Sequence, residues 1–285
     1  MAGVSRSGYY RWCSIGARNS EEREKKDYED FRKIKEAYAF RGYSKGCRGI
    51  SMRLRRMGIV MNPKKIRRLM KKYGLYCPIR KHNPYRELMR ILRTDATAPN
   101  LVNRQFRSQG ARKILLTDIT YIPYHGKFAY LSVIKDAYTM QIISYVLSES
   151  LEVDFVLETV RKAYREHMIP EGATAILHSD QGSHYTSVAF RRLLEDKGLT
   201  QSMSRKGNCW DNAPQESFFG HMKDELKPYS RKWTAFEQVK ERIDDWIDYY
   251  NNDRYQTPLK SMSPNEYYHY LISGKIPAAL VEQKA

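Results

Sequence analysis

The sequence predicts an α/β protein with a mixed sheet in the order βββαβαβα, preceded by a small all-helical domain and followed by further helices. Three observations support this fold class. Runs of alternating or apolar residues, each of strand length, follow one another between residues 113 and 147. From residue 151 onward, stripes of helical spacing alternate with short apolar runs. Before all of these, a strongly basic stretch shows helical spacing.

The first three strands are expected at residues 113–121, 128–135 and 141–147. Short turns at residues 124–126 and 136–138 connect them. Connections of this length join antiparallel neighbours, so we expect three antiparallel strands.

Helices and strands should alternate in the rest of the chain. We expect a helix at 151–167, a strand ending at His178, a helix at 187–197, a strand at 199–203 and a helix at 213–226. An aromatic stripe at 233–250 predicts a helix that packs on the sheet, and Ser263 with Pro264 begins a last short helix.

Two short helices with a turn between them are predicted nearer the N-terminus. The first covers residues 45–57, Gly58 breaks it, and Asn62 with Pro63 begins the second, which ends at Gly74. This is the pattern of a helix-turn-helix domain, and a basic helical hairpin with no nucleic-acid role is the alternative. The outward face of the second helix carries six side chains that could hold phosphates: Lys64, Lys65, Arg67, Arg68, Lys71 and Lys72.

The charge of the chain points to a polyanionic partner. The formal net charge is +18, and residues 41–90 contain sixteen Lys and Arg against a single acid, Glu87. A one-signed block of this size favours nucleic acid over a membrane surface, since it lacks a strong apolar helical face. There is no apolar run of membrane-spanning length, and the start of the chain lacks the apolar centre of a signal peptide. We therefore expect a soluble intracellular protein.

Five parts are expected along the chain. They are an N-terminal segment with a linker helix (1–40), a helix-turn-helix DNA-binding domain (41–92), a connector interrupted by prolines (93–110), a catalytic core (111–228) and a C-terminal helical extension (229–285). The four cysteines have no short paired spacing, so free thiols are expected rather than a zinc site.

Three carboxylates occupy contexts that suit metal chemistry. Asp118 lies within an apolar strand, Asp180 directly follows one, and Glu216 lies early in a helix that Asn212 and Pro214 open. Phosphoryl transfer by two divalent ions needs carboxylates that converge on metals about 3.5–4 Å apart. All-oxygen ligands favour Mg²⁺ or Mn²⁺ over zinc. The alternative is that the three are separate capping or surface acids.

Other residues near these acids could belong to the same site. Asp136 is the main rival ligand, although its place before a turn favours a turn role. His178 and His184 flank Asp180. Either could orient a metal-bound water or contact phosphate, but we expect structural roles, because a lone histidine near a sheet edge is more often structural. Three basic residues could contact DNA beside the metals: Arg205 and Lys206 in a flexible loop, and Lys223, seven residues after Glu216 on nearly the same helical face.

Five strings in order along the chain resemble one family. They are Val4–Trp12, Leu116–Tyr121, His178–Tyr185, Asn208–Phe219 and Trp246–Asn252. Together they are similar to the second-frame (OrfB) product of bacterial insertion-sequence transposases. In the same order and with similar spacing, Asp118, Asp180 and Glu216 resemble the DDE triad of the ribonuclease-H-like core of the retroviral-integrase type.

The resemblance implies a polynucleotidyl transferase that uses two Mg²⁺ or Mn²⁺ ions, held by Asp118, Asp180 and Glu216. Such an enzyme nicks the ends of its element and joins the exposed 3′-hydroxyl to another phosphodiester. Its implied partners are double-stranded DNA (terminal repeats and target), a second copy of the chain on DNA, and an upstream product joined by frameshifting. The implied location is the bacterial cytoplasm, on the nucleoid. Two alternatives remain open: a non-catalytic DNA-binding regulator on a degenerate core, and a structure-specific nuclease of the same fold.

Overall fold

The computed structural model describes residues 5–11, 13, 17–43, 45–77, 98–166, 168–170, 172, 174–205, 208–277 and 280. The chain divides into two units, residues 1–78 with 278–285, and residues 79–277. Each unit has its own hydrophobic core. The predicted boundary at residue 92 lies outside the described residues. Within the described part of the chain, no helix is long and apolar enough to cross a membrane.

The first unit is helical. It contains α1 (Arg6–Arg11), α2 (Ala17–Ala39), a 3-10 turn at Phe40–Gly42, α3 (Cys47–Arg56) and α4 (Pro63–Lys72). Its core is made by Ile34 of α2, Ile50 and Leu54 of α3, and Ile66 and Leu69 of α4, all fully buried. The side chain of Asn62 caps α4 by accepting a hydrogen bond from the Lys64 amide at 2.8 Å. The predicted helix-turn-helix arrangement is therefore confirmed.

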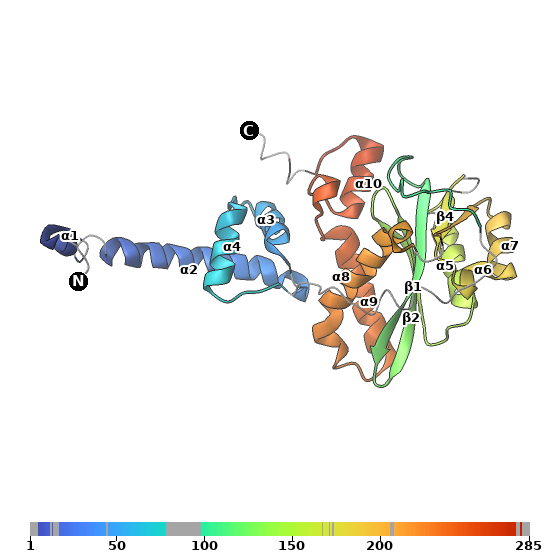
Figure 1. The fold of residues 1–285 in the computed structure, drawn as a ribbon, viewed down its shortest axis with the longest axis horizontal. Coiled ribbons are helices and arrows are strands. Elements are labelled where there is room, and N and C mark those ends of the chain that lie inside the picture. The colour runs from blue at the N-terminus through green and yellow to red at the C-terminus, as the bar shows by residue number, and fades with distance from the viewer. Residues whose placement is uncertain are drawn as a thin grey trace. The chain divides into compact units, whose positions relative to one another are not determined.

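The second unit is built on a five-stranded mixed sheet (Figure 1). The strands are β1 (Ile114–Tyr124), β2 (Lys127–Asp136), β3 (Ile142–Ser148), β4 (Ile176–Ser179) and β5 (Thr200–Met203), in the spatial order β3-β2-β1-β4-β5. β1, β2 and β3 pair antiparallel, as predicted, whereas β4 and β5 continue the sheet in parallel with β1.

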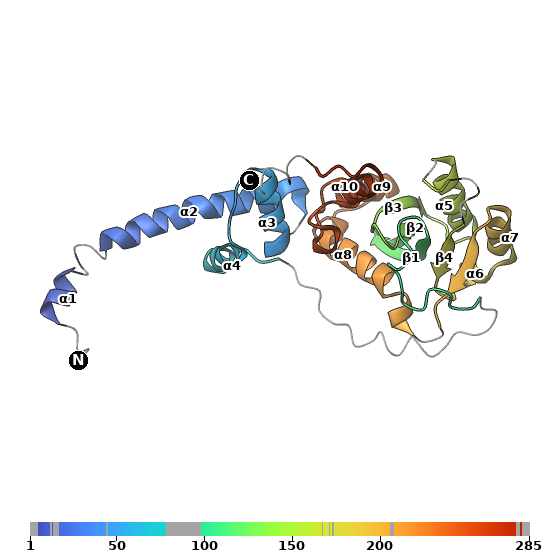
Figure 2. The ribbon, with the colours of Figure 1, turned by 90° about the horizontal axis from the view of Figure 1, so that it is seen from above.

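Helices cover both faces of this sheet (Figure 2). They are α5 (Asp154–Arg165), α6 (Ser183–Thr186), α7 (Val188–Asp196), α8 (Ala213–Ser230), α9 (Phe236–Asn252) and α10 (Pro264–Ser273). α5 packs on β2 and β3 and α7 on β5, on one face; α8 packs on β1 and α9 on β3, on the other. The predicted element order and the α/β class are confirmed.

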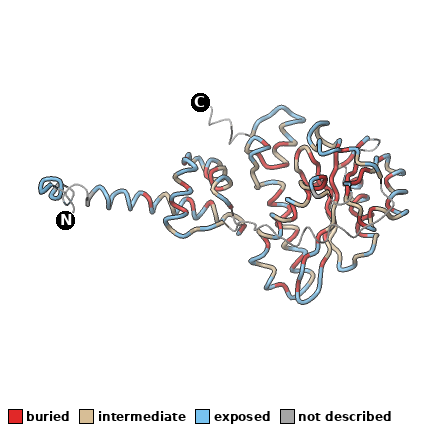
Figure 3. Tube along the Cα trace, in the orientation of Figure 1, coloured by how far each residue is buried: buried red, intermediate tan, exposed pale blue. Residues whose placement is uncertain are grey.

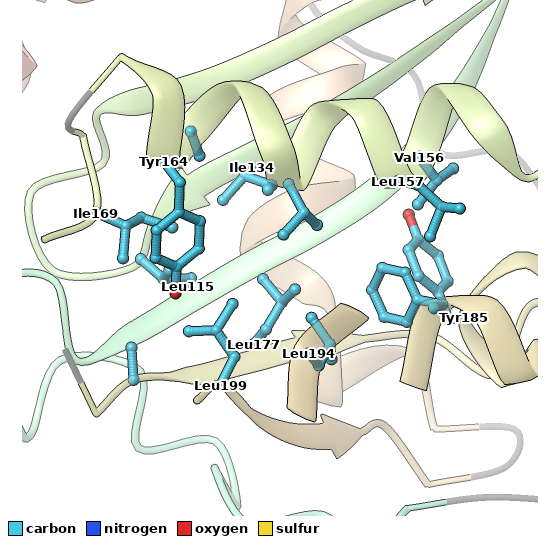
Figure 4. Close-up of a cluster of buried hydrophobic side chains, with 14 of the residues drawn as sticks. Leu115, Ile134, Val156, Leu157, Tyr164, Ile169, Leu177, Tyr185, Leu194 and Leu199 are labelled. Atoms are coloured by element: carbon cyan, nitrogen blue, oxygen red, sulfur yellow. The ribbon is translucent and has the colours of Figure 1, made fainter. Parts of the chain in front are cut away.

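The core of the second unit lies between the sheet and α5. Leu115, Ile134 and Leu177 of the sheet meet Val156 and Val160 of α5, and all five are almost completely buried (Figure 4). The central strands are buried along most of their length, and the exposed residues lie on the outer helices and loops (Figure 3). A rigid sheet of this kind fixes the positions of side chains at its carboxyl edge.

Two local features differ from the prediction. The hairpin of β1 and β2 extends to Tyr124 and Lys127, because His125 and Gly126 both adopt positive φ angles (40° and 72°) that suit a tight two-residue turn. α6 was not predicted, since only four residues form it and too short a stretch shows no helical period.

Candidate active site

Asp118, within β1, and Asp180, directly after β4, belong to neighbouring strands of the sheet. β1 and β4 are parallel neighbours in which Leu116 lies opposite His178. Two residues further on, Asp118 and Asp180 therefore reach the same level on adjacent strands. Tyr185, buried beside them, has a pKa well above its ordinary value because of burial and the negative charges of Asp118 and Asp180.

Asp118 is held by two hydrogen bonds. Its Oδ1 accepts one from the amide of Ile119 at 2.8 Å, and its Oδ2 accepts another from Nδ2 of Asn212 at 3.0 Å. Asn212 is the residue before α8, so this second bond ties β1 to the start of that helix. Asn212 lies within the family string Asn208–Phe219, but nothing in the sequence alone predicts its partner.

Asp180 is held by the turn that follows it. Its Oδ1 accepts a hydrogen bond from the Gly182 amide at 2.8 Å. A Cβ atom at Gly182 would lie only 2.9 Å from that oxygen. A side chain at this position would therefore displace the carboxylate, whereas the backbone angle of Gly182, φ −62°, is one that any residue adopts.

Glu216 lies in the first turn of α8, which packs on β1. Desolvation raises the pKa of Asp118; the charge of Asp180 adds to this, and the charge of Glu216 adds a smaller amount. The hydrogen bonds from Ile119 and Asn212 act in the opposite direction. The three acids are thus close enough for their charges to interact, and divalent cations would relieve the repulsion between them.

The three acids do not form a preassembled metal site in this structure. Among the described residues, no three His, Cys, Asp or Glu side chains lie close enough together to hold a metal ion. The donor chemistry of Asp118 and Asp180 nevertheless fits a hard divalent cation. Oδ1 of Asn212 is buried beside them without a hydrogen-bond partner, as expected where a polar ligand or water belongs.

Asp136, the rival ligand, has a structural role. It is fully buried, and its Oδ2 accepts hydrogen bonds from the amide and the guanidinium of Arg112, both at 3.0 Å. Its Oδ1 accepts one from the Tyr138 amide at 2.9 Å. These bonds close the turn after β2, as its position in the sequence suggested.

The two histidines also bond to the fold. The ring of His178 is fully buried between Oγ of Ser202 and the carbonyl of Asp211, each at 2.9 Å, and burial lowers its pKa. Nε2 of His184 lies 2.6 Å from the carbonyl of Leu151. Both histidines fix neighbouring segments of the active-site edge.

Arg205 lies beside this edge and shares a buried acid with Arg104. The side chain of Asp211 is inaccessible to solvent and receives Nε of each arginine at 2.8 Å, which lowers its pKa. Both arginines remain about half exposed, at 47% and 51% of their side-chain surface. They can face a phosphate while remaining anchored. Lys206 lies outside the described residues; Lys223 is exposed on α8.

The basic residues of α4 divide into two stripes. A helix turns about 100° per residue, so residues spaced by three and then four share a face. Lys65, Arg68 and Lys72 face α2, where they pair with Asp30, Asp27 and Glu24, and Lys72 also reaches Asp27 at 2.9 Å. The second stripe, Lys64, Arg67 and Lys71, is exposed on the face away from the core.

The first stripe is bound tightly to α2. Asp27 receives two hydrogen bonds from the guanidinium of Arg68, at 2.6 and 2.8 Å, and its pKa falls well below its ordinary value because of Arg68 first and Lys72 second. The sequence prediction treated all six basic residues alike. The stripes could not be distinguished there, because the acids that select one of them lie about forty residues earlier in the chain, on α2.

Family models match most of the chain. An HTH-like domain covers residues 25–83, and two integrase core domain models cover residues 109–209 and 197–264. An uncharacterized 31 kDa protein of insertion element IS600 from Shigella sonnei is 33% identical over 94% of this chain and 97% of its own length. The transposase for insertion sequence element IS904 from Lactococcus lactis is 33% identical over 79% of this chain and 87% of its own length. The chain belongs to the insertion-sequence transposases.

The fold of this transposase agrees with that assignment. Its structure resembles the solved intasome of simian T-cell lymphotropic virus with PP2A regulatory subunit B56 gamma, at a TM-score of 0.52 and 14% identity over 76% of this chain and 70% of that one. At that identity the likeness shows the fold alone, which is the predicted ribonuclease-H-like fold of integrases. The resemblance predicted from the five strings is confirmed, and the core belongs to a class of polynucleotidyl transferases.

Proposed function

We propose that this transposase cuts the ends of its element and joins them to target DNA in a reaction that depends on divalent cations. The observation that supports this most strongly is the pair Asp118 and Asp180, placed at one level on adjacent parallel strands, with the charge of Glu216 acting on the first of them. Asp118 and Asp180 would hold Mg²⁺ or Mn²⁺, and Glu216 would complete a two-ion site. The cations would activate the attacking oxygen and stabilise the leaving oxygen.

Each of the two reactions replaces one phosphorus–oxygen bond. In the first, water attacks the phosphorus at the element end, and the 3′-oxygen leaves with a proton as a 3′-hydroxyl. In the second, that hydroxyl loses its proton, its oxygen bonds to a phosphorus of the target, and the target strand's own 3′-oxygen leaves with a proton. The role of the protein is to align the attacking and leaving oxygens. Asn212 and the Gly182 amide contribute by fixing the two aspartates.

DNA is proposed to be held by basic residues of both units. Lys64, Arg67 and Lys71 of α4 would contact the terminal repeat, while Lys65, Arg68 and Lys72 secure α4 on α2. Arg205, Lys206 and Lys223 would hold the backbone near the acids. Because two element ends must be brought together, we propose at least a dimer on DNA; an upstream fused product would add further end recognition.

Labelled element ends test the proposal directly. The full chain is incubated with end DNA and a target plasmid, with and without Mg²⁺, alongside the Glu216→Gln variant. The expected result is Mg²⁺-dependent nicking and joined product from the wild type and neither from Glu216→Gln. Nicking without joining would identify a nuclease of the same fold. Binding without any cleavage, at any Mg²⁺ or Mn²⁺ concentration, would identify a regulator.

A further inference from the structure

Lys135 is a buried lysine next to the acids. It lies near the end of β2, opposite Leu116 of β1, two residues before Asp118, and only 4% of its surface is exposed. An ammonium group is almost never buried without a partner, since desolvation of the charge is costly. Its neighbours therefore indicate why it is there.

Two groups of α8 receive the side chain of Lys135. Its Nζ donates a hydrogen bond to the carbonyl of Pro214 at 2.7 Å and lies 5.1 Å from the centre of the Phe218 ring. Pro214 and Phe218 bracket Glu216 in the sequence, so Lys135 holds the turn of helix that carries the third acid. No carboxylate is hydrogen-bonded to Nζ among the described residues.

Asp118 is the acid whose charge acts on Lys135. Burial lowers the pKa of Lys135, while the negative charge of Asp118 favours its protonated form. Lys135 is thus held by a carbonyl and a ring of α8 and interacts electrostatically with Asp118, which is itself repelled by Asp180 and Glu216 when no cation is bound.

We propose that Lys135 is a positioning residue whose positive charge offsets the repulsion among Asp118, Asp180 and Glu216 before divalent cations bind, while its hydrogen bond fixes the first turn of α8 on β2. This rests on the proposed function, because it takes these acids to be the cation site. It predicts that the charge of Lys135 competes with a bound cation and is coupled to Asp118 even without one.

A double-mutant cycle tests the coupling in the absence of metal. Denaturant unfolding is measured in EDTA for the full chain, Lys135→Met, Asp118→Asn and the double variant. The loss caused by Lys135→Met should be roughly half or less in the Asp118→Asn background, because its charged partner is then gone. Lys162→Met is the matched control: Lys162 also donates to a carbonyl, that of Tyr145 at 3.2 Å, and lies 4.4 Å from the Tyr145 ring, but on α5. Its loss should be equal in both backgrounds.

A Mg²⁺ titration without DNA tests the competition. Lys135→Met should bind Mg²⁺ roughly tenfold more tightly than the wild type, since a neighbouring positive charge has been removed. Lys162→Met should bind as the wild type does. A lysine that only packs would leave the Mg²⁺ affinity unchanged and destabilise the protein equally in both backgrounds, and that pair of results would overturn the inference.

Variants that do not fold, and a wild type that binds no Mg²⁺, also test the inference. If Lys135→Met does not fold but the double variant does, the coupling to Asp118 is established; if neither folds, Lys135 is required whatever Asp118 carries, and the inference fails. If the wild type binds no Mg²⁺ while the metal-free cycle shows coupling, the cation site of the proposed function fails and the role of Lys135 as a counter-charge stands.

Discussion

The division of α4 into two basic stripes gives a quantitative prediction about DNA binding. Replacing Lys64, Arg67 and Lys71 together by Gln removes three positive charges from the exposed stripe. Replacing Lys65, Arg68 and Lys72 by Gln removes the same number from the stripe that pairs with α2. The two variants are matched in charge and in chemistry, and they lie on the same helix. Any difference between them reflects the face on which the charges lie.

The size of the effect follows from counterion release. Each phosphate neutralised by a basic side chain contributes about 0.9 to the slope of log affinity against log salt concentration. Three contacts therefore contribute about 2.7, which corresponds to about a 40-fold loss of affinity for a fourfold rise in salt. We expect the exposed-stripe variant to lack this part of the salt dependence. The paired-stripe variant should keep it.

Fluorescence anisotropy with labelled terminal-repeat DNA measures the slope, with no divalent metal and about 50–200 mM salt. Thermal unfolding is followed in parallel, because the paired stripe should instead stabilise the first unit through Asp27 and its neighbours. A lower melting temperature with an unchanged slope is expected for the paired-stripe variant. The reasoning is refuted if that variant loses the slope while folded, or if the exposed-stripe variant retains the full slope of the wild type.

Three further predictions concern single residues. Asn212→Asp should reduce strand joining at least about tenfold and more than Asn212→Ala does, because it places a carboxylate against Oδ2 of Asp118. Equal losses in a joining assay would contradict this. Gly182→Ala should lower joining without unfolding the protein, since its Cβ displaces the Asp180 carboxylate. Gly46→Ala is the control: its Cβ meets nothing within 4 Å, so joining should be unchanged. Asp27→Asn should lower the melting temperature at pH 7, and the gap from wild type should shrink as the pH falls below 3.8. An acid whose pKa is lowered by folding stabilises fully above its ordinary pKa and loses that contribution as the pH falls toward its lower folded-state pKa. A constant gap across a pH series would exclude the ion pairs as its source.

The order of elements could be read from the sequence because each is set by local patterning. The strand-length apolar runs of β1 and β2, the cap at Asn62 and the helix start at Ser263 are contained within a few residues, and the structure shows all of them. The positions of Asp118 within a strand and of Asp180 directly after one were predicted in the same way and are confirmed. Their role as metal ligands stays a prediction. Boundaries were less accurate where a tight turn extended the β1–β2 hairpin by three residues on the first strand.

What the sequence could not supply is the set of contacts between distant segments. Asn212 reaches Asp118 across 94 residues, and Lys135 reaches Pro214 across 79. No local period encodes either pairing. A signal for Lys135 was nevertheless present: a lysine that interrupts the apolar end of a central strand requires a buried partner, and the partner had to come from an element packed on that strand.

These two contacts constrain how the third acid can join the other two. The first turn of α8 is bonded to β1 through Asn212 and to β2 through Lys135, so the backbone that carries Glu216 is fixed to the two central strands from both sides. A displacement of this turn would strain both bonds at once. Under the proposed function, a three-acid site is therefore completed by rotation of the Glu216 side chain, which is only partly buried, while α8 stays in place. A cation that drew this carboxylate inward would also weaken the need for the charge of Lys135. The proposal thus links binding of the cation to this buried lysine through a helix that does not move.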